Sequence, residues 1–151
     1  KVFMKVINSK SSLLILLAVL FGLNLSARND RLRFEIKDAL ETPDAKAKVV
    51  DEVKLYWGKE TKVKFKEKVA SVKTNKKTNA FNKSDLQACQ WVFLSAVIAL
   101  QDRARELGGD AVINIRSNYQ NIPYDSTEKF ECGAGNIIAG VALMGDVVKT
   151  K

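Results

Sequence analysis

The stretch from Ser84 to Gly108 constrains the fold more than any other part of the chain, because it carries the signals for both ends of a long helix. Ser84 and Gln87 form a capping-box pattern, and Gly108 stands where a helix-ending glycine belongs. The intervening residues include an apolar stripe at helical spacing, and their middle, ACQWVFLSAVIAL, is apolar nearly all round. We therefore expect a helix over about 85–107 that is covered on more than one side.

Segments of alternating polarity before and after this helix predict strands. They include residues 53–57, 61–73, 110–117, 128–132 and 136–148. In the third, Ala111, Ile113 and Ile115 are expected to face inward. The second is expected to be one long strand or a hairpin with a bulge near Glu67, ending in a polar loop over 74–83.

The order of these elements predicts the fold class. A short helix is expected over 44–49, with Thr42 as its N-cap and Pro43 at its first position. A strand, the 85–107 helix and another strand follow in succession, which suggests a βαβ crossover. We expect an α+β fold in which a mixed, mostly antiparallel sheet packs on one long central helix.

Residues 1–27 have the layout of a secretory signal peptide. Lys5 and Lys10 precede an apolar run from Leu13 to Leu23, and Ala27 closes a small-residue cleavage site. The run is about half the roughly 20 residues that span a bilayer, which favours a cleaved leader over an uncleaved anchor or a core helix. The sequence predicts residues 28–151 as one periplasmic domain.

The two cysteines are expected to meet. In EKFEC, Phe130 and Cys132 share the inward face, and Lys129 and Glu131 face outward. Cys89 lies on the buried stripe of the helix, so a Cys89–Cys132 disulfide is the favoured interpretation for an exported chain. Two separate buried thiols are the alternative.

A metal site or a catalytic cysteine is disfavoured on composition. The chain contains no histidine, and its two cysteines cannot complete a zinc site without carboxylates. No C-x-x-C or phosphate-binding glycine motif is present. Gly133 and Gly135 are interpreted as residues of a tight turn between two strands. We expect no cofactor, no bound metal and no nucleotide.

An alternating lysine face is the candidate binding surface. It comprises Lys62, Lys64, Lys66 and Lys68. Such a face suits an anionic polymer or lipid head groups, and it also suits a solvated strand that resists edge pairing. The chain as a whole carries a formal net charge of +8. The patch lacks arginine and aromatic residues, which makes nucleic acid an improbable partner.

Two smaller groups of side chains are further candidate functional surfaces. Tyr119 and Tyr124 flank a loop that would suit a small recognition surface or ordinary amphipathic loop packing. Asp102, Glu106 and Asp110 place carboxylates near the end of the long helix, where neighbouring arginines favour surface charge pairing over acid–base chemistry.

The passages TNKKTNAFNKSDLQACQWVFLSAVIALQDRARELGGDAVINIRSNYQ and ECGAGNIIAGVALMGDVVK resemble a family of small exported proteobacterial proteins of unknown function. Its members often carry the label "excinuclease ATPase subunit". The passage ARELGGDAVINIR is more distantly similar to YbjQ-type domains and to the outer-membrane lipoprotein that senses stress in the Rcs pathway. The resemblance implies a compact mixed sheet with one main helix and, from the lipoprotein, disulfide stapling.

These observations favour a non-enzymatic periplasmic protein that acts through protein or envelope contacts. A binding module for anionic polymers is the alternative. A DNA-repair role, which the excinuclease label would suggest, is disfavoured because the chain has no Walker A motif and no zinc motif. The leader would contact a membrane only before its cleavage.

Overall fold

A computed structural model describes residues 28–59 and 62–151 of the chain. The predicted signal peptide, residues 1–27, lies outside the described residues. Within the described ranges, no helix is both long enough and apolar enough to cross a membrane.

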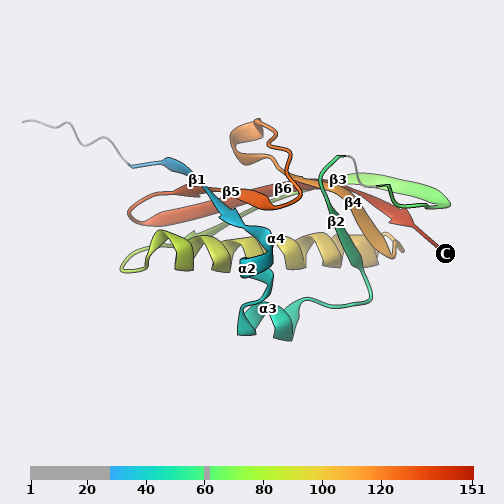
Figure 1. Ribbon diagram of the computed structural model, residues 1–151, viewed down its shortest axis with the longest axis horizontal. Coiled ribbons are helices and arrows are strands. Elements are labelled where there is room, and N and C mark those ends of the chain that lie inside the picture. The colour runs from blue at the N-terminus through green and yellow to red at the C-terminus, as the bar shows by residue number, and fades with distance from the viewer. Residues whose placement is uncertain (1–27, 60–61) are drawn as a thin grey trace, which may run out of the picture.

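The described residues form a mixed α/β structure with a curled sheet and helices packed against it (Figure 1). The strands are β1 (Asp30–Glu35), β2 (Lys54–Trp57), β3 (Glu67–Asn79), β4 (Ala111–Ser117), β5 (Lys129–Ala134) and β6 (Ile138–Lys149). The helices are α2 (Ile36–Leu40), α3 (Pro43–Lys48) and α4 (Asp85–Glu106), with a 3-10 turn, η1, at Tyr119–Asn121. Helix α4 lies along one face of the sheet, and the β4–β5 connection lies over the opposite face (Figure 1).

Strand β6 organises the sheet. It pairs antiparallel with β3 along one edge and with β5 and β4 along the other. Strand β1 extends the sheet beyond β5, and β2 pairs in parallel with β4. The strands that flank α4 in sequence, β3 and β4, therefore do not pair with each other, because β6 lies between them.

The ends of the helices form as their cap residues predict. The Ser84 side chain accepts a hydrogen bond from the Gln87 amide at 3.2 Å, and Gly108 has a φ of +71° just past the end of α4. The Thr42 hydroxyl accepts from the Ala45 amide at the start of α3. These short-range signals set the helix bounds because each capping hydrogen bond joins residues only three positions apart in the chain.

The core lies between α4 and the sheet. Phe93 of α4 stacks on Phe130 of β5, with ring centroids 4.0 Å apart, and also contacts Trp57 of β2 at 5.5 Å. Both phenylalanine side chains are fully buried. The predicted inward faces of α4 and β5 are therefore confirmed for these residues.

The predicted disulfide between Cys89 and Cys132 is present. It joins α4 to β5 across the core, with the two Cα atoms 5.9 Å apart and the two cysteines 43 positions apart in sequence. A crosslink that closes a loop of this length stabilises a fold by about 2–4 kcal/mol, largely by restricting the unfolded chain. The bond therefore fixes the two layers to each other near the start of the helix.

Ala111, Ile113 and Ile115, the predicted inward set of β4, are all buried but do not share one face. Ala111 and Ile113 pack with Val148 on one face, while Ile115 joins the main core with Val112 on the other. The cause is a bulge at Asn114, which has a φ of +54° and interrupts the pairing with β6. One extra residue reverses the alternation of the side chains that follow it.

Strand β3 also differs from its prediction at both ends. Residues 62–66 are not a strand, because β6 ends at Lys149 and offers no partner beyond Glu67. Of the predicted polar loop over 74–83, residues 74–79 are instead strand, paired with β6 as far as Ile138, and only 80–83 are outside it. The bulge expected near Glu67 occurs between Lys68 and Ala70.

The Asn114 bulge leads to a stability prediction. A β-branched residue at positive φ costs about 1–2 kcal/mol relative to glycine, and both changes remove the same Asn114 side-chain hydrogen bond to Asp146. Asn114→Val is therefore expected to unfold at a lower urea concentration than Asn114→Gly. The slope of the unfolding free energy against urea concentration should be the same for both variants. Equal stability of the two variants would show that the bulge does not require this backbone conformation.

Candidate functional site

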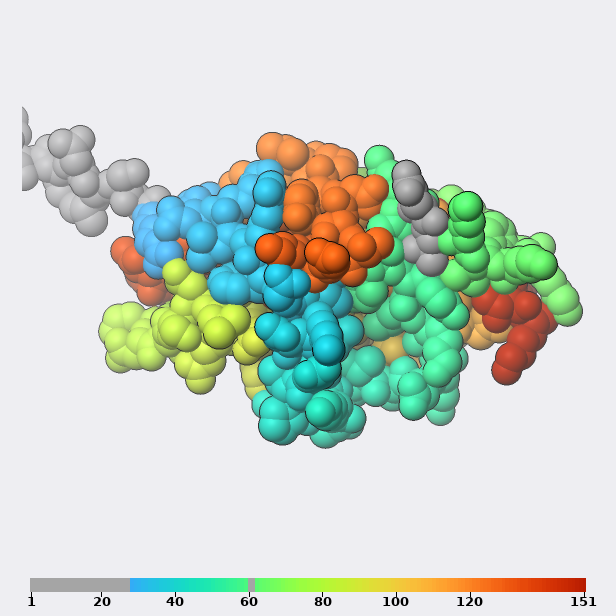
Figure 2. All heavy atoms as spheres, in the orientation of Figure 1, coloured from blue at the N-terminus to red at the C-terminus, as the bar shows by residue number. Residues whose placement is uncertain are grey.

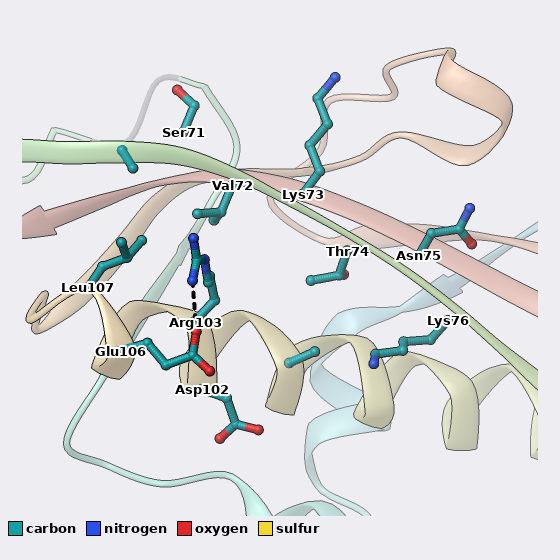
Figure 3. A pocket seen from close by; sticks show the side chains of 12 residues that line it. Ser71, Val72, Lys73, Thr74, Asn75, Lys76, Asp102, Arg103, Glu106 and Leu107 are labelled. Atoms are coloured by element: carbon teal, nitrogen blue, oxygen red, sulfur yellow. Dashed lines mark hydrogen bonds and ion pairs between the residues drawn. The ribbon is translucent and has the colours of Figure 1, made fainter.

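A groove of about 580 Å³ lies between β3 and the C-terminal half of α4 (Figure 3). Seven consecutive residues of β3, from Ala70 to Lys76, form one wall. The other wall comes from α4 and the residue that follows it: Ala99, Asp102, Arg103, Glu106 and Leu107. The groove therefore follows β3 lengthwise, with α4 as its other wall.

Side chains of β3 alternate between the groove and the opposite face of the sheet. Val72, Thr74 and Lys76 extend toward α4, while Ser71 and Lys73 extend away from it (Figure 3). The Lys73–Met144 and Thr74–Leu143 pairs set the register against β6, and Leu143 is buried in the core. The groove side of β3 is thus continuous with the core face of the sheet.

The outer edge of β3 is free. Among the described residues, β3 pairs with no strand except β6. The Ala80 amide donates to the Ile137 carbonyl at 2.7 Å, just past the end of the strand. Because antiparallel pairs alternate in their hydrogen bonding, the even-numbered residues of β3 point their backbone groups at β6 and residues 71, 73, 75 and 77 point theirs outward.

Polar groups line the groove. The Thr74 hydroxyl oxygen is buried and has no hydrogen-bond partner. Arg103 and Glu106 form an ion pair at 2.8 Å on the helix wall (Figure 3), and Arg105 pairs with Asp102 on the same helix. The groove therefore presents an unsatisfied hydroxyl inside and paired charges at its rim.

Sequence reasoning missed this site because it placed residues 74–79 in a loop. The polar composition of TNKKTN is typical of a loop, and nothing local indicates that β6 extends far enough to pair with it. The one signal in the sequence is the alternation of Val72, Thr74 and Lys76 with Lys73 and Asn75.

The four lysines predicted to share a strand face do not lie on one strand. Lys62, Lys64 and Lys66 are exposed in the irregular segment before β3, and Lys68 alone is in the strand. Val63 packs against the cluster of Ala111, Ile113 and Val148, which fixes the course of this segment without strand pairing. The regular spacing on which the predicted basic face depended is absent.

Lys68 instead forms an ion pair with Asp146 at 2.8 Å. Asp146 also accepts hydrogen bonds from Ser71 and Asn114. Burial acts to raise the pKa of Asp146, but the hydrogen bonds from Lys68, Ser71 and Asn114 outweigh it and hold the pKa below its usual value. Asp146 therefore links β3, the β4 bulge and β6 through one carboxylate.

A second cluster lies on the sheet face opposite α4. Glu131 was expected to face outward to solvent, but it is 1% exposed. Its carboxylate lies 3.3 Å from Arg33 and 3.7 Å from Arg31, which belong to the adjacent strand β1. The β4–β5 connection covers it, and the Ser117 hydroxyl accepts a hydrogen bond from the Glu131 amide. The two arginines compensate the buried charge.

Tyr119 and Tyr124 belong to this second cluster. The guanidinium of Arg31 lies 5.6 Å from the Tyr119 ring centre, and that of Arg33 lies 4.1 Å from the Tyr124 ring centre. A Cβ atom at Gly133 would lie 1.9 Å from the Tyr119 ring. Gly133 therefore allows the tyrosine to approach the sheet, and its φ is not positive, so the predicted tight-turn role is wrong.

The carboxylates near the end of α4 are used in surface pairs. Asp102 and Glu106 pair with arginines of the same helix. Asp110 accepts hydrogen bonds from the amide and hydroxyl of Thr150. In the part of the chain that the structure describes, no three histidine, cysteine, aspartate or glutamate side chains cluster closely enough to hold a metal ion.

Comparisons of the chain with protein-family models, with curated proteins and with solved structures gave no match.

The depressed pKa of Asp146 leads to a prediction for acid stability. A carboxylate whose pKa is lower in the folded state stabilises the fold above its unfolded pKa, near 3.9, and loses that contribution as pH falls through the folded value. Asp146→Asn should therefore reduce stability at pH 7 and make the free energy of unfolding less dependent on pH below about pH 5. Urea unfolding between neutral and acid pH measures both effects.

Asp38→Asn serves as the control, because Asp38 is exposed on α2. It should leave the pH dependence as in the wild-type chain. If Asp146→Asn and the wild type lose stability in parallel on acidification, the carboxylate does not have the role assigned to it.

Proposed function

We propose that the protein is a non-enzymatic periplasmic binding domain that holds an extended, acidic segment of a partner protein by strand addition to β3. The observation that carries the proposal is the free edge of a 13-residue strand with a groove along it. Strand addition uses backbone groups for affinity and side-chain pockets for selectivity. A binding role of this kind fits the expected membership in a family of small exported proteins. In the fold, α4 would act as the central helix of a β2–α4–β4 crossover.

The free backbone groups provide the first part of the binding site. An added strand would pair with the outward amides and carbonyls of Ser71, Lys73, Asn75 and Lys77. These groups already have extended geometry because β6 fixes β3 from the other side. Binding therefore requires ordering of the partner segment but little change in this domain.

The groove provides the second part. Alternate side chains of an added strand would point toward α4, where Ala99 leaves room between β3 and the helix. The unpartnered Thr74 hydroxyl would gain a hydrogen-bond partner from a bound polar group. The other side chains of the added strand would lie beside Lys73 and Lys77.

The charge of β3 favours an acidic partner over a second copy of this chain. The strand carries four lysines and one glutamate, Glu67. Antiparallel pairing of two copies about Asn75 would set Lys73 opposite Lys77 of the other copy, and like charges directly opposite each other destabilise a sheet. Lysines on an edge strand suppress self-association and leave pairing with an oppositely charged segment favourable.

The free edge predicts a pattern of amide exchange. In the purified protein, the amides of residues 71, 73, 75 and 77 should exchange with solvent faster than those of residues 72, 74, 76 and 78. Peptides selected from a random library for binding to this protein should be acidic at alternate positions. When bound, they should slow the amide exchange of residues 71, 73, 75 and 77. Hydrogen-exchange NMR makes both measurements.

Two substitutions at one residue isolate the backbone contribution. Asn75→Pro removes an outward amide without removing a bond to β6, whereas Asn75→Ala removes the same side chain and keeps the amide. The selected peptides should bind Asn75→Pro at least about tenfold more weakly than Asn75→Ala. Equal binding to both, with each variant folded, would exclude strand addition.

Export is the second component of the proposal. The N-terminal layout of the sequence and the Cys89–Cys132 bond support a chain that matures in an oxidising compartment. The absence of histidine from the chain supports a binding role over acid–base catalysis.

Mass spectrometry of the protein from its native host tests this component. We expect a mature chain that starts near Arg28 and two cysteines that resist alkylation until a reductant is added. Full-length chains with both cysteines alkylated after unfolding, without reductant, would contradict export.

A further inference from the structure

Three large apolar side chains are exposed together at one end of the molecule. Phe81 is 60% exposed, Ile137 65% and Ile138 54%. They line one shallow hollow: Phe81 lies in the β3–α4 connection, Ile137 lies in the β5–β6 connection, and Ile138 is the first residue of β6. The Ala80 amide donates to the Ile137 carbonyl at 2.7 Å and ties the two connections together. We name these three residues the apolar tip.

Cationic side chains surround the apolar tip. Lys77 lines the same hollow, and the Lys83 ammonium group donates to the Asn79 carbonyl at 2.9 Å. Neither lysine forms an ion pair with any described carboxylate. The two acidic residues close by, Asp30 and Asp85, both pair with Arg28. The free charge beside the apolar tip is therefore positive.

The described chain begins at this same end. Arg28 and Asn29 line a hollow of about 450 Å³ together with Ile137 and Ile138. Figure 2 shows the blue start of the described chain, the yellow-green start of α4 and the red β5–β6 turn gathered at one end. In sequence, only residues 24–27 separate Arg28 from the apolar run Leu13–Leu23. The described chain thus starts beside the apolar tip, one residue after the predicted cleavage site at Ala27.

We propose that the apolar tip docks on the surface of an anionic phospholipid bilayer, with its apolar side chains in the interface and Lys77 and Lys83 at the head groups. Insertion of exposed apolar side chains combined with attraction of lysines to acidic lipids is a general mode of peripheral membrane binding. A stable protein partner needs about 800 Å² on each side, much more than three side chains at the end of two loops provide. A bilayer requires no complementary shape, so a small projecting tip suffices.

Sedimentation with lipid vesicles tests the proposal on the oxidised protein. The protein should pellet with vesicles of phosphatidylglycerol and phosphatidylcholine, less so as salt is raised, and not with phosphatidylcholine alone. Ile137→Ser with Ile138→Ser should weaken binding about tenfold or more. Lys77→Gln with Lys83→Gln should weaken it by a similar factor and reduce its salt dependence.

Matched controls distinguish binding through the apolar tip from nonspecific hydrophobic or electrostatic binding to vesicles. Phe65→Ser with Ile122→Ser removes two exposed apolar side chains elsewhere, and Lys46→Gln with Lys151→Gln removes two exposed lysines elsewhere. Both control variants should bind as the wild type does, and circular dichroism checks that every variant is folded. The proposal is overturned if the wild type fails to pellet, if neutral vesicles bind it equally, or if the control and tip variants lose binding together.

Discussion

The structure depends on the burial of one aromatic side chain, Phe93, where α4 meets the sheet. Its ring contacts Trp57 of β2 on one side and Phe130 of β5 on the other, and Phe130 in turn contacts Phe34 of β1. This row of rings connects the helix with strands from both ends of the sheet. Because β2 and β1 are the outer strands of the β1-β5-β6-β4-β2 order, the row joins parts that do not hydrogen-bond to each other.

Features determined by neighbours in sequence could be predicted. The bounds of α4 follow from Ser84 and Gly108, and the inward direction of Cys132 follows from simple alternation in a short, regular strand. The disulfide follows from combining the two, since each cysteine lies on the buried side of its own element. In each case the deciding interaction lies within a few residues, so the local pattern contains the information.

Features determined by distant residues could not be predicted. The reversal in β4 depends on Asn114 together with Gly145, where a Cβ atom would lie 2.8 Å from a methyl group of Val112. Burial of Glu131 requires a covering connection and two arginines that precede it by about a hundred positions in sequence. The length of β3, and with it the groove, is set by how far β6 extends. A single sequence does not encode these pairings in any short window.

The Cys89–Cys132 bond has a consequence for timing. If the chain is exported as we propose, it must be threaded through a translocation channel while extended, and a domain that locked early would obstruct that passage. A crosslink between a helix and a strand 43 positions apart cannot close while the sulfur atoms are kept reduced before transit. The chain would thus stay uncrosslinked in the compartment where it is synthesised, and the bond would form only after export.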